Sequence, residues 1–335
     1  MMTDSYYRPI PAPGTGHWRL AGGWVRFSQV ERLRRGAAPE ILNDVPADVL
    51  DALTAPRPPL LGLALDRPRL MGIVNATPDS FSDGGAYDPM AQARLLADGG
   101  ADLLDVGGES TRPGAEELPA DQEIARIRPI IAAMAATGIA ISVDTRKAAV
   151  ARDAIGVGAA MVNDVAGFDF DPDLAGLVAE SGVPVCLMHA QGLPETMQDD
   201  PRYDDVLLDV YDALAARIAR AEAAGIPRAR IVVDPGIGFG KTEAHNLAIL
   251  RRISVYHGLG CPILLGASRK RFIGAVAGRF GGTEAPAPPD RVPGTLAVTL
   301  AAVAQGVQIH RVHDLGAIRQ GLALWHALHD EDRTV

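Results

Sequence analysis

The residues best suited to chemistry in this sequence are acids, amides and cations that follow short apolar runs. One set combines carboxylates, a carboxamide and an ammonium group, which suits the edge of a flat heterocycle that carries several donors and acceptors. Its members are Asp144, Asn163, Asp234 and Lys270. A second set offers neutral and cationic donors, which suit phosphate oxygens. Its members are Asn75, Thr111, Arg112, Arg311 and His313. Together the two sets predict a site with a heterocycle end and an anion end.

Ordinary structural roles are open to each of these residues taken alone. Asp144 and Asn163 could cap helices, and Asp234 could form a turn with the proline that follows it. Such residues follow every one of eight apolar runs, however, and buried carboxylates and amides are costly unless they are paired. We therefore favour one shared site over eight unrelated roles.

The eight apolar runs are short and end at polar residues or glycine, which is typical of buried strands. They span residues 70–74, 102–106, 139–143, 160–162, 184–188, 230–233, 262–266 and 307–312. Helix-end signals lie between the runs. Asp88 and Asp171 each precede a proline and predict helix N-caps. Gly99 and Gly182 predict the positions where helices stop.

Strands that are apolar on both faces and alternate with helices imply an α/β protein whose parallel sheet is covered on each side. Eight such units between residues 67 and 335 match the count and size of a closed TIM (β/α)8 barrel. The carboxyl ends of all eight strands would then meet at one mouth. A doubly wound open sheet is the alternative, although it would place its ligand at a single switch point.

Residues 1–66 are rich in proline, glycine and arginine and precede the predicted barrel domain of residues 67–335. We interpret them as an N-terminal extension. Two possibilities stay open at this point: the extension packs on the barrel, or it is poorly ordered and takes no part in the chemistry.

Composition limits the classes of partner. The net charge of −9 argues against nucleic acid or an anionic membrane surface held by bulk electrostatics, because both require a basic face. The two cysteines, Cys186 and Cys261, lie in apolar runs and are expected to be buried free thiols, which fits a reducing cytoplasm. The N-terminus has no signal-peptide pattern, and the longest uncharged stretch, residues 294–309, is too short to span a bilayer. We expect a soluble, cytoplasmic protein.

Two patterns resemble known sites without fitting them. The segment DPGIGFGKT, residues 234–242, nearly matches a phosphate-binding loop, but the first glycine of that pattern would fall on Pro235. We interpret it as a tight loop whose glycines let the backbone approach a ligand, with Phe239 available to cover one face. The histidines, including His189, His310 and His313, do not have the spacing of a zinc site.

Motifs from residue 75 to residue 314 resemble those of the dihydropteroate synthase family of the folate pathway. The motifs are NATPDSFSDGG (75–85), DVGGESTRPGA (105–115), SVDTRK (142–147), NDV (163–165), LMH (187–189), DPGIGFGK (234–241), GASRKRFIG (266–274) and RVHD (311–314). The resemblance implies a transferase that condenses 6-hydroxymethyl-7,8-dihydropterin diphosphate with p-aminobenzoate, assisted by Mg²⁺, to give 7,8-dihydropteroate and diphosphate. It also implies a homodimer and a target for sulfonamides, which mimic p-aminobenzoate.

Carried over position by position, the resemblance assigns a role to each motif residue. The pterin pocket would consist of Asp144, Asn163, Met188, Asp234, Phe239 and Lys270. The diphosphate would contact Asn75, Thr111, Arg112, Arg311 and His313, with Asn75 also a ligand of Mg²⁺. The p-aminobenzoate cleft would include Thr111, Arg112, Pro113 and Arg271. Asp144, Asp83 and Lys270 would be catalytic, with Asp83 reaching the reaction centre when the loop of residues 76–85 closes.

Two positions depart from the family pattern. Ile237 occupies a place where the loop often carries an aromatic residue, which could alter loop packing. Arg271 stands where some members have a serine near the carboxylate of p-aminobenzoate, so the anion contact could use a different group.

The implied reaction explains the residue types. Departure of diphosphate leaves a pterin-stabilised methylene cation, so the site must stabilise charges of both signs. The arylamine is an adequate nucleophile, and we expect no covalent enzyme intermediate. Two other functions remain as alternatives: a pterin-dependent methyltransferase acting on methyltetrahydrofolate, and a non-catalytic pterin binder. Neither would require the diphosphate-binding residues.

Overall fold

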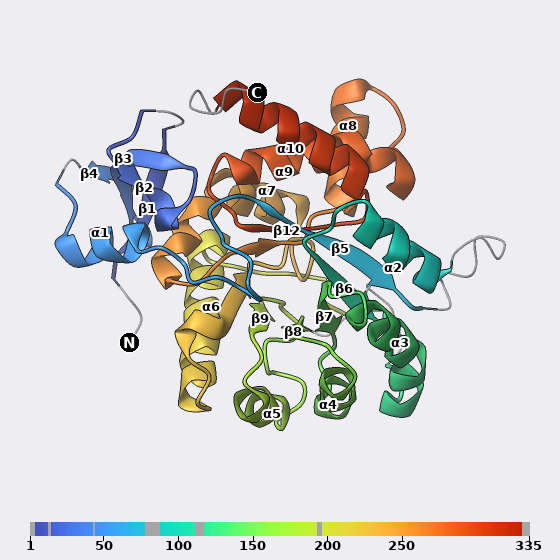
Figure 1. Ribbon diagram of the computed structural model, residues 1–335. Coiled ribbons are helices and arrows are strands. Elements are labelled where there is room, and N and C mark those ends of the chain that lie inside the picture. Colours follow the sequence, from blue (N-terminus) through green and yellow to red (C-terminus); the bar gives the residue numbers. More distant parts are fainter. Residues whose placement is uncertain are drawn as a thin grey trace.

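A closed ring of parallel strands forms the centre of the protein (Figure 1). The computed structural model describes residues 4–12, 15–42, 44–77, 88–110, 117–192 and 196–329. Within these ranges, eight parallel strands pair in the order β10-β9-β8-β7-β6-β5-β12-β11. They are β5 (Arg69–Asn75), β6 (Leu103–Gly107), β7 (Ala140–Asp144), β8 (Met161–Asp164), β9 (Val185–Met188), β10 (Ile231–Asp234), β11 (Leu264–Leu265) and β12 (Ile309–Val312).

A parallel bridge between Val233 and Ile263 closes the ring beside β10 and β11. The Val233 N–H donates to the carbonyl of Pro262 at 2.9 Å. The predicted TIM barrel is therefore confirmed. The doubly wound alternative is wrong because β12 pairs with β5 and leaves no switch point in the strand order.

Helices follow the strands and surround the barrel (Figure 1). They are α2 (Pro89–Asp98), α3 (Ala120–Ala135), α4 (Ala148–Gly156), α5 (Leu174–Ser181), α6 (Val206–Ala223), α7 (Glu243–Arg251), α8 (Arg271–Gly281), α9 (Val292–Val303) and α10 (Leu315–His329). Short 3-10 helices occur at η3 (Arg228–Arg230), η4 (Ile253–Leu259) and η5 (Pro288–Arg291). The longest described α-helix, α6, lies next to the N-terminal part of the chain.

Three of the four predicted helix ends are confirmed. The Asp88 carboxylate accepts the Met90 N–H and caps α2, with proline at the first helical position. Gly99 ends α2, and Gly182 ends α5 in the left-handed conformation that favours glycine.

The predicted cap at Asp171 is wrong, because α5 begins three residues later at Leu174. Instead, one Asp171 oxygen accepts the N–H of Ala148, the first residue of α4, at 2.7 Å. The other oxygen accepts the Asp173 N–H at 3.0 Å. The carboxylate therefore satisfies an amide at the start of the preceding helix, a tertiary role that sequence spacing does not reveal.

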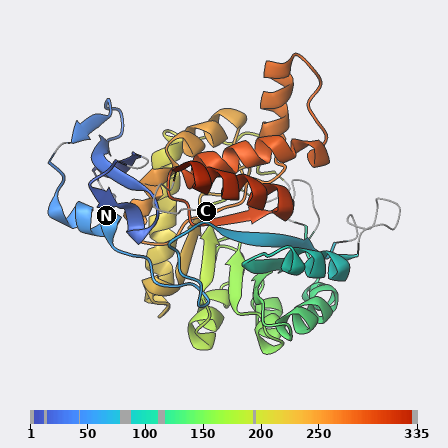
Figure 2. The same cartoon turned by 45° about the horizontal axis from the view of Figure 1, so that its top comes forward.

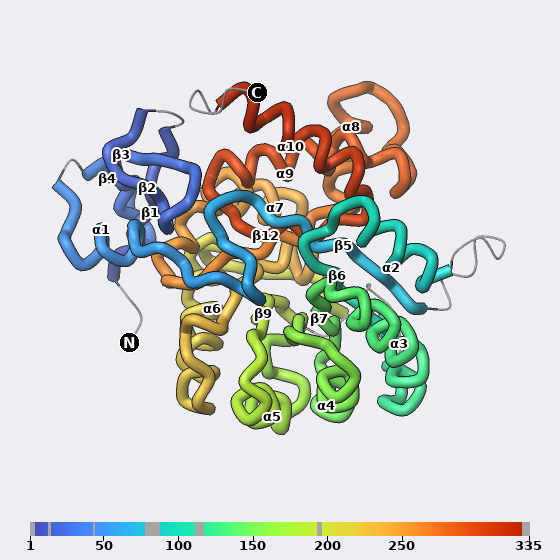
Figure 3. Tube along the Cα trace, in the orientation of Figure 1, coloured from blue at the N-terminus to red at the C-terminus, as the bar shows by residue number. Residues whose placement is uncertain are grey.

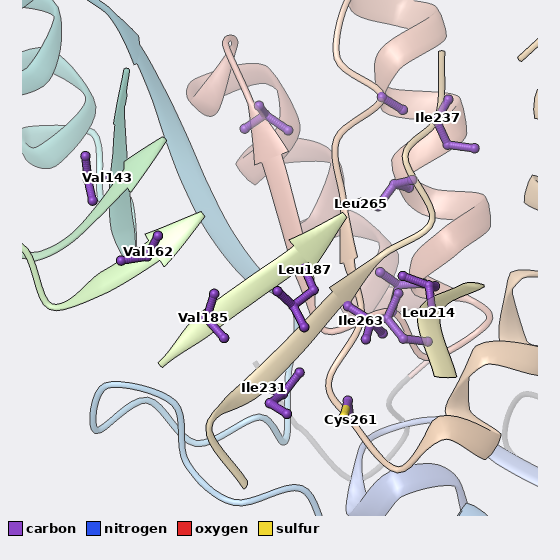
Figure 4. Close-up of a cluster of buried hydrophobic side chains, with 14 of the residues drawn as sticks. Val143, Val162, Val185, Leu187, Leu214, Ile231, Ile237, Cys261, Ile263 and Leu265 are labelled. Atoms are coloured by element: carbon purple, nitrogen blue, oxygen red, sulfur yellow. The ribbon is translucent and has the colours of Figure 1, made fainter. Parts of the chain in front are cut away.

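Apolar residues cover both faces of the strands. Outward-facing side chains such as Val185 and Leu187 pack in the cluster that contains Leu214 of α6 (Figure 4). Inward-facing side chains form a separate cluster at the amino end of the barrel: Met71, Leu103, Met161, Cys186, Val232, Leu264 and Ile309. Cys186 and Cys261 are both buried and free, as predicted.

The described part of residues 1–66 is folded and does not form a poorly ordered segment. It contains β1 (Tyr6–Pro11), β2 (Trp18–Arg19), η1 (Leu20–Gly22), β3 (Arg26–Leu33), β4 (Glu40–Leu42) and α1 (Ala47–Thr54). The strands form an antiparallel sheet with its own core: Leu20, Val25, Phe27, Val30 and Leu53. Figures 2 and 3 show this blue unit against one side of the barrel.

The chain then crosses the amino end of the barrel before it enters β5. Leu60 and Leu65 join the inward-facing cluster at the amino end of the strands. Within the described ranges, no helix has both the length and the apolar character needed to cross a bilayer.

Candidate active site

The carboxyl ends of neighbouring strands bring the predicted residues into one row. Asn75 at the end of β5 is in register with Gly107, Gly107 with Asp144, and Asp144 with Asn163. Parallel pairing places these residues at the same level of the barrel, because equal register keeps strand ends together. The predicted convergence of these strand ends at one mouth is therefore confirmed.

Two acids and one cation form the polar centre of the mouth. Arg311 on β12 donates from Nε to Asp105 at 2.5 Å and from Nη2 to Asp144 at 2.6 Å. Asn163 donates from Nδ2 to the same Asp105 oxygen at 3.0 Å. The other Asp105 oxygen is buried and has no hydrogen-bond partner among the described residues. One guanidinium therefore serves two carboxylates, and one acceptor remains available to a ligand.

Burial dominates the electrostatics of this cluster. It raises the pKa of Asp144 to about 7, with Arg311 opposing the shift and Asp105 adding to it. Because the two acids share a single cation, a proton on one carboxyl relieves the excess negative charge. The raised pKa of Asp144 therefore follows from its burial beside a second acid.

Asp234, Lys270 and Phe239 lie close together at the ends of β10 and β11 and in the loop after β10. Asp234 is in register with Met188, and its Oδ1 accepts the Gly236 N–H at 2.7 Å. Lys270 donates to the Ile237 carbonyl, and its Nζ lies 4.0 Å from the centre of the Phe239 ring. Burial raises the pKa of Asp234 and lowers that of Lys270 to about 7, against the attraction between the two.

Lys241 holds the glycine loop of residues 236–240 against the end of β9. Its Nζ donates to the carbonyls of Gly236 at 2.9 Å, Phe239 at 3.0 Å and His189 at 3.3 Å. The same nitrogen lies 2.9 Å from His189 Nδ1. Lys241 is only 2% exposed, so it is unavailable to a phosphate. The segment of residues 234–242 therefore does not act as a phosphate-binding loop through this lysine. Burial lowers the pKa of His189 to about 2, so that ring is neutral.

The predicted anion residues occupy different surroundings. His313 follows β12 and lies beside Ser268, whose Oγ is 3.0 Å from Nδ1. Arg311 was assigned to the diphosphate, but its guanidinium lies between the two acids at the centre of the mouth. Arg271 is exposed at the first position of α8, while the preceding Arg269 is paired with Asp314.

The remaining predicted residues, Asp83, Thr111, Arg112 and Pro113, lie outside the described residues. A second loop, residues 108–119, joins β6 to α3, and the structure describes both of its ends. Glu109 accepts the Leu118 N–H at 2.8 Å, and Lys147 donates to the Leu118 carbonyl at 2.5 Å. Lys147 also pairs with Glu109 and with the buried Glu123. The two ends of the loop are therefore joined by buried ion pairs.

Asp105 and Lys241 are site residues that the sequence reasoning missed. Asp105 is an acid within an otherwise apolar strand, LLDVG, and that position is a signal that could have identified it. Lys241 gives no comparable signal, because a lysine after a glycine loop is common on protein surfaces.

A cavity of about 220 Å³ lies beside this mouth. Its lining comes from loops after β7, β8, β9 and β10 and from α6: Arg146, Val165, Ala166, Asp169, Phe170, Ala190, Gly192, Met197, Arg217 and Phe239. Phe239 is shared with the predicted pocket, so the cavity adjoins the polar centre without containing it.

Comparison with known proteins places this geometry in a family. The family described as "Pterin binding enzyme" matches residues 71–313. The dihydropteroate synthase of Neisseria meningitidis serogroup B is 44% identical over 275 residues, which cover 79% of this chain and 94% of the relative. The dihydropteroate synthase of Escherichia coli K12 is 44% identical over 258 residues, covering 76% and 89%.

Solved structures agree with this assignment. Dihydropteroate synthase from Xanthomonas albilineans with 4-aminobenzoic acid matches with a TM-score of 0.74 and 45% identity, covering 80% of this chain and 95% of that one. The Yersinia pestis enzyme in complex with a sulfonamide drug matches with a TM-score of 0.74 and 40% identity, covering 79% and 96%. The chain belongs to the pterin-binding enzyme family and, within it, to the dihydropteroate synthases, which are transferases of folate biosynthesis.

Proposed function

We propose that the barrel mouth condenses 6-hydroxymethyl-7,8-dihydropterin diphosphate with p-aminobenzoate to give 7,8-dihydropteroate and diphosphate. The observation that carries the proposal is that the cluster of Asp105, Asp144, Asn163 and Arg311 and the pair of Asp234 and Lys270 occupy the same barrel mouth. A structure of the Xanthomonas albilineans relative holds 7,8-dihydropteroate, the product of this reaction.

The pterin edge would bind the acids and the amide. Carboxylates accept hydrogen bonds from ring and amino N–H groups, and Lys270 donates to a ring or carbonyl acceptor. Each charge-assisted hydrogen bond contributes about 1.5–3 kcal/mol. Met188 and Phe239 would pack against the flat ring, because they border these polar groups.

The diphosphate would bind at the side of Asn75 and His313. Mg²⁺ would supply Lewis-acid stabilisation of the leaving diphosphate. Magnesium in such sites is bound by one or two protein oxygens plus substrate phosphates, so the Asn75 amide oxygen at the strand end suits it. Within the described ranges no group of three acidic, cysteine or histidine side chains could form a separate metal site. Thr111 and Arg112 would complete the anion contacts.

Asp144 would stabilise the positive charge that develops on the pterin methylene as the C–O bond breaks. Its carboxylate is held by Arg311 and is therefore fixed before the substrate arrives. Asp83 and the two loops would exclude water, which otherwise competes with the arylamine. No side chain needs to form a covalent bond with the pterin, and a pterin–protein adduct isolated after quenching would contradict this mechanism.

The decisive assay mixes the protein with the dihydropterin diphosphate, p-aminobenzoate and Mg²⁺ and measures diphosphate and dihydropteroate. We expect both products in equal amounts. Folded protein that yields neither, while it transfers a methyl group from methyltetrahydrofolate, would establish the methyltransferase alternative instead.

Variants separate the roles within the site. Lys270→Ala is expected to weaken pterin binding, and Asp144→Asn is expected to lower kcat with a smaller change in pterin affinity. Arg271→Ala serves as the matched comparison, because it should raise the KM for p-aminobenzoate alone. Wild-type kinetics in the Lys270 and Asp144 variants would refute the pocket assignment.

We further propose a cytoplasmic homodimer, as the resemblance implies, with residues 67–335 as the catalytic domain. A dimer would use helices away from the mouth. Leu324 and Leu328 on α10 are 63% and 71% exposed, and a subunit contact would cover such apolar side chains. Analytical ultracentrifugation of the wild-type chain and of Leu328→Glu tests this assembly, with a shift towards monomer expected in the variant.

A further inference from the structure

The N-terminal sheet, β1–β4, contacts the beginning of α6. Arg35 donates to Asp209, and its other terminal nitrogen donates to Asp212 at 2.6 Å. Tyr6 donates from its hydroxyl to Asp212 at 2.8 Å, and its ring meets the Tyr211 ring edge-on with centroids 5.2 Å apart. The sheet lies outside the segment that the family matches, and Figure 1 shows it beside α6.

Asp209 also binds the chain that leads into α6. Its Oδ2 accepts the N–H groups of Asp204 at 2.9 Å and Asp205 at 3.2 Å, while Oδ1 accepts from Arg35. Asp205 is the N-cap of the helix. The arrangement resembles a capping box in which an acid within the first turn reaches back to the cap N–H. Arg35 therefore holds the Asp209 carboxylate in place. That carboxylate in turn binds the last residues of the loop between β9 and α6, residues 189–205.

The described parts of this β9–α6 loop reach the active site. Tyr203, next to Asp204, donates from its hydroxyl to the Gly240 carbonyl at 2.7 Å. Gln198 donates to the Gly238 carbonyl at 2.6 Å. Phe239 lies between these two glycines, so the loop holds the backbone on both sides of that ring.

We propose that the N-terminal sheet is a positioning element of the active site. Through Arg35 and Asp209 it orders the end of the β9–α6 loop, and through Tyr203 it sets the position of Phe239 against the pterin. This inference rests on the proposed function, because it uses the assignment of Phe239 to the pterin pocket. Arg35 does not touch the substrate and acts only through the loop.

The size of the effect follows from exposure. The side chains of Arg35 and Asp209 are 33% and 25% exposed, and ion pairs of this kind are individually weak. We expect Arg35→Met to raise the KM for the dihydropterin diphosphate about three- to fivefold with little change in kcat. A change of this size is smaller than the 1.4 kcal/mol that corresponds to a tenfold change, as expected for a weak ion pair. The KM for p-aminobenzoate should change less.

The experiment compares Arg35→Met and Asp209→Asn with two controls in the full-length chain. Asp212→Asn removes the negative charge that Arg35 and Tyr6 contact on α6 but leaves Asp209 bonded to the loop. Arg34→Met removes a neighbouring arginine whose ion pair among the described residues is with the exposed Glu40, at 3.6 Å. We expect raised KM in the first two variants, wild-type KM in the controls, and partial recovery in Arg35→Lys. The double variant Arg35→Met/Asp209→Asn should be no worse than Asp209→Asn alone.

Hydrogen exchange provides a readout independent of activity. The amides of Asp204 and Asp205 should exchange about fivefold faster in Arg35→Met and at the wild-type rate in Asp212→Asn. An active wild-type enzyme whose KM is unaltered by Arg35→Met would overturn the positioning role while leaving the proposed function intact. Equal effects of Asp212→Asn and Arg35→Met would also overturn it. A wild-type chain that forms no dihydropteroate would instead refute the proposed function.

Discussion

Replacing Arg311 by methionine tests the electrostatic account of the barrel mouth most directly. The guanidinium lies 2.5 Å from Asp105 and 2.6 Å from Asp144, so its removal leaves two acids without their cation. Breaking a buried ion pair by removing one partner costs about 3–5 kcal/mol. A carboxyl can avoid most of that cost by taking up a proton, and the penalty should therefore depend on pH.

The sign of this dependence follows from the pKa of Asp144, which is raised from 3.8 to about 7 in the folded protein. The folded state holds a proton that the unfolded state releases, so this contribution to stability is present in full below the unfolded pKa and is lost as the pH rises through about 7. Without Arg311 the folded pKa rises further, and the variant continues to lose stability above pH 7. The slope for one proton is about 1.4 kcal/mol per pH unit.

Urea unfolding followed by circular dichroism at pH 6.5, 7.5 and 8.5 measures this difference. We expect Arg311→Met to be less stable than wild type at each pH, with the difference in free energy of unfolding widening by about 2 kcal/mol between pH 6.5 and pH 8.5. Arg311→Lys retains the positive charge, so its free energy of unfolding should fall less steeply with pH than that of Arg311→Met. A gap that stays constant or narrows as the pH rises would refute the shared-cation interpretation.

Four other predictions address the same site. Lys241→Met leaves two carbonyls of the glycine loop and the carbonyl of His189 without their donor. It should raise the KM for the pterin substrate at least tenfold, at about 1–3 kcal/mol per unsatisfied group, and Lys241→Arg tests whether charge alone suffices. Asp105→Asn should weaken pterin binding about tenfold, measured by calorimetry, because it replaces one acceptor of Arg311. The ratio of pterin affinity in the wild type to that in Lys270→Met should fall as the pH rises through about 7, because Lys270 loses its proton there while Asp144 titrates in both proteins. Chelating Mg²⁺ should abolish diphosphate release but leave binding of a pterin without diphosphate unchanged.

The barrel was predictable because its signals are local. Each strand is a short apolar run, and each polar residue at its end marks the mouth. In the structure, parallel pairing holds Asn75, Gly107, Asp144 and Asn163 in register at that mouth. The helix-end prediction failed at Asp171, where the carboxylate satisfies a different helix.

The hydrogen bonds and ion pairs within the site were harder to predict from the sequence. The strand ends placed Asp144 and Arg311 in one mouth, with the acid at the pterin end and the cation at the diphosphate end. They did not predict that Arg311 pairs directly with Asp144 and also with Asp105, an acid buried within a strand. Lys241 binds carbonyls of its own loop and of the β9 end, and such contacts depend on where the backbone lies after folding. The N-terminal sheet was recognisable only as an extension, because its contacts with α6 join residues that are far apart in the chain.

The path of the connecting segment has a practical consequence for dissecting this protein. Leu60 and Leu65 precede β5, yet they complete the hydrophobic layer at the amino end of the barrel. A fragment that starts at Arg67 would keep every motif of the family. It would still lose the two leucines that cover the amino end of the barrel. Shortened versions meant to represent the minimal enzyme should therefore begin before Leu60, and insertions or fused partners are better placed ahead of that residue than at the apparent domain boundary.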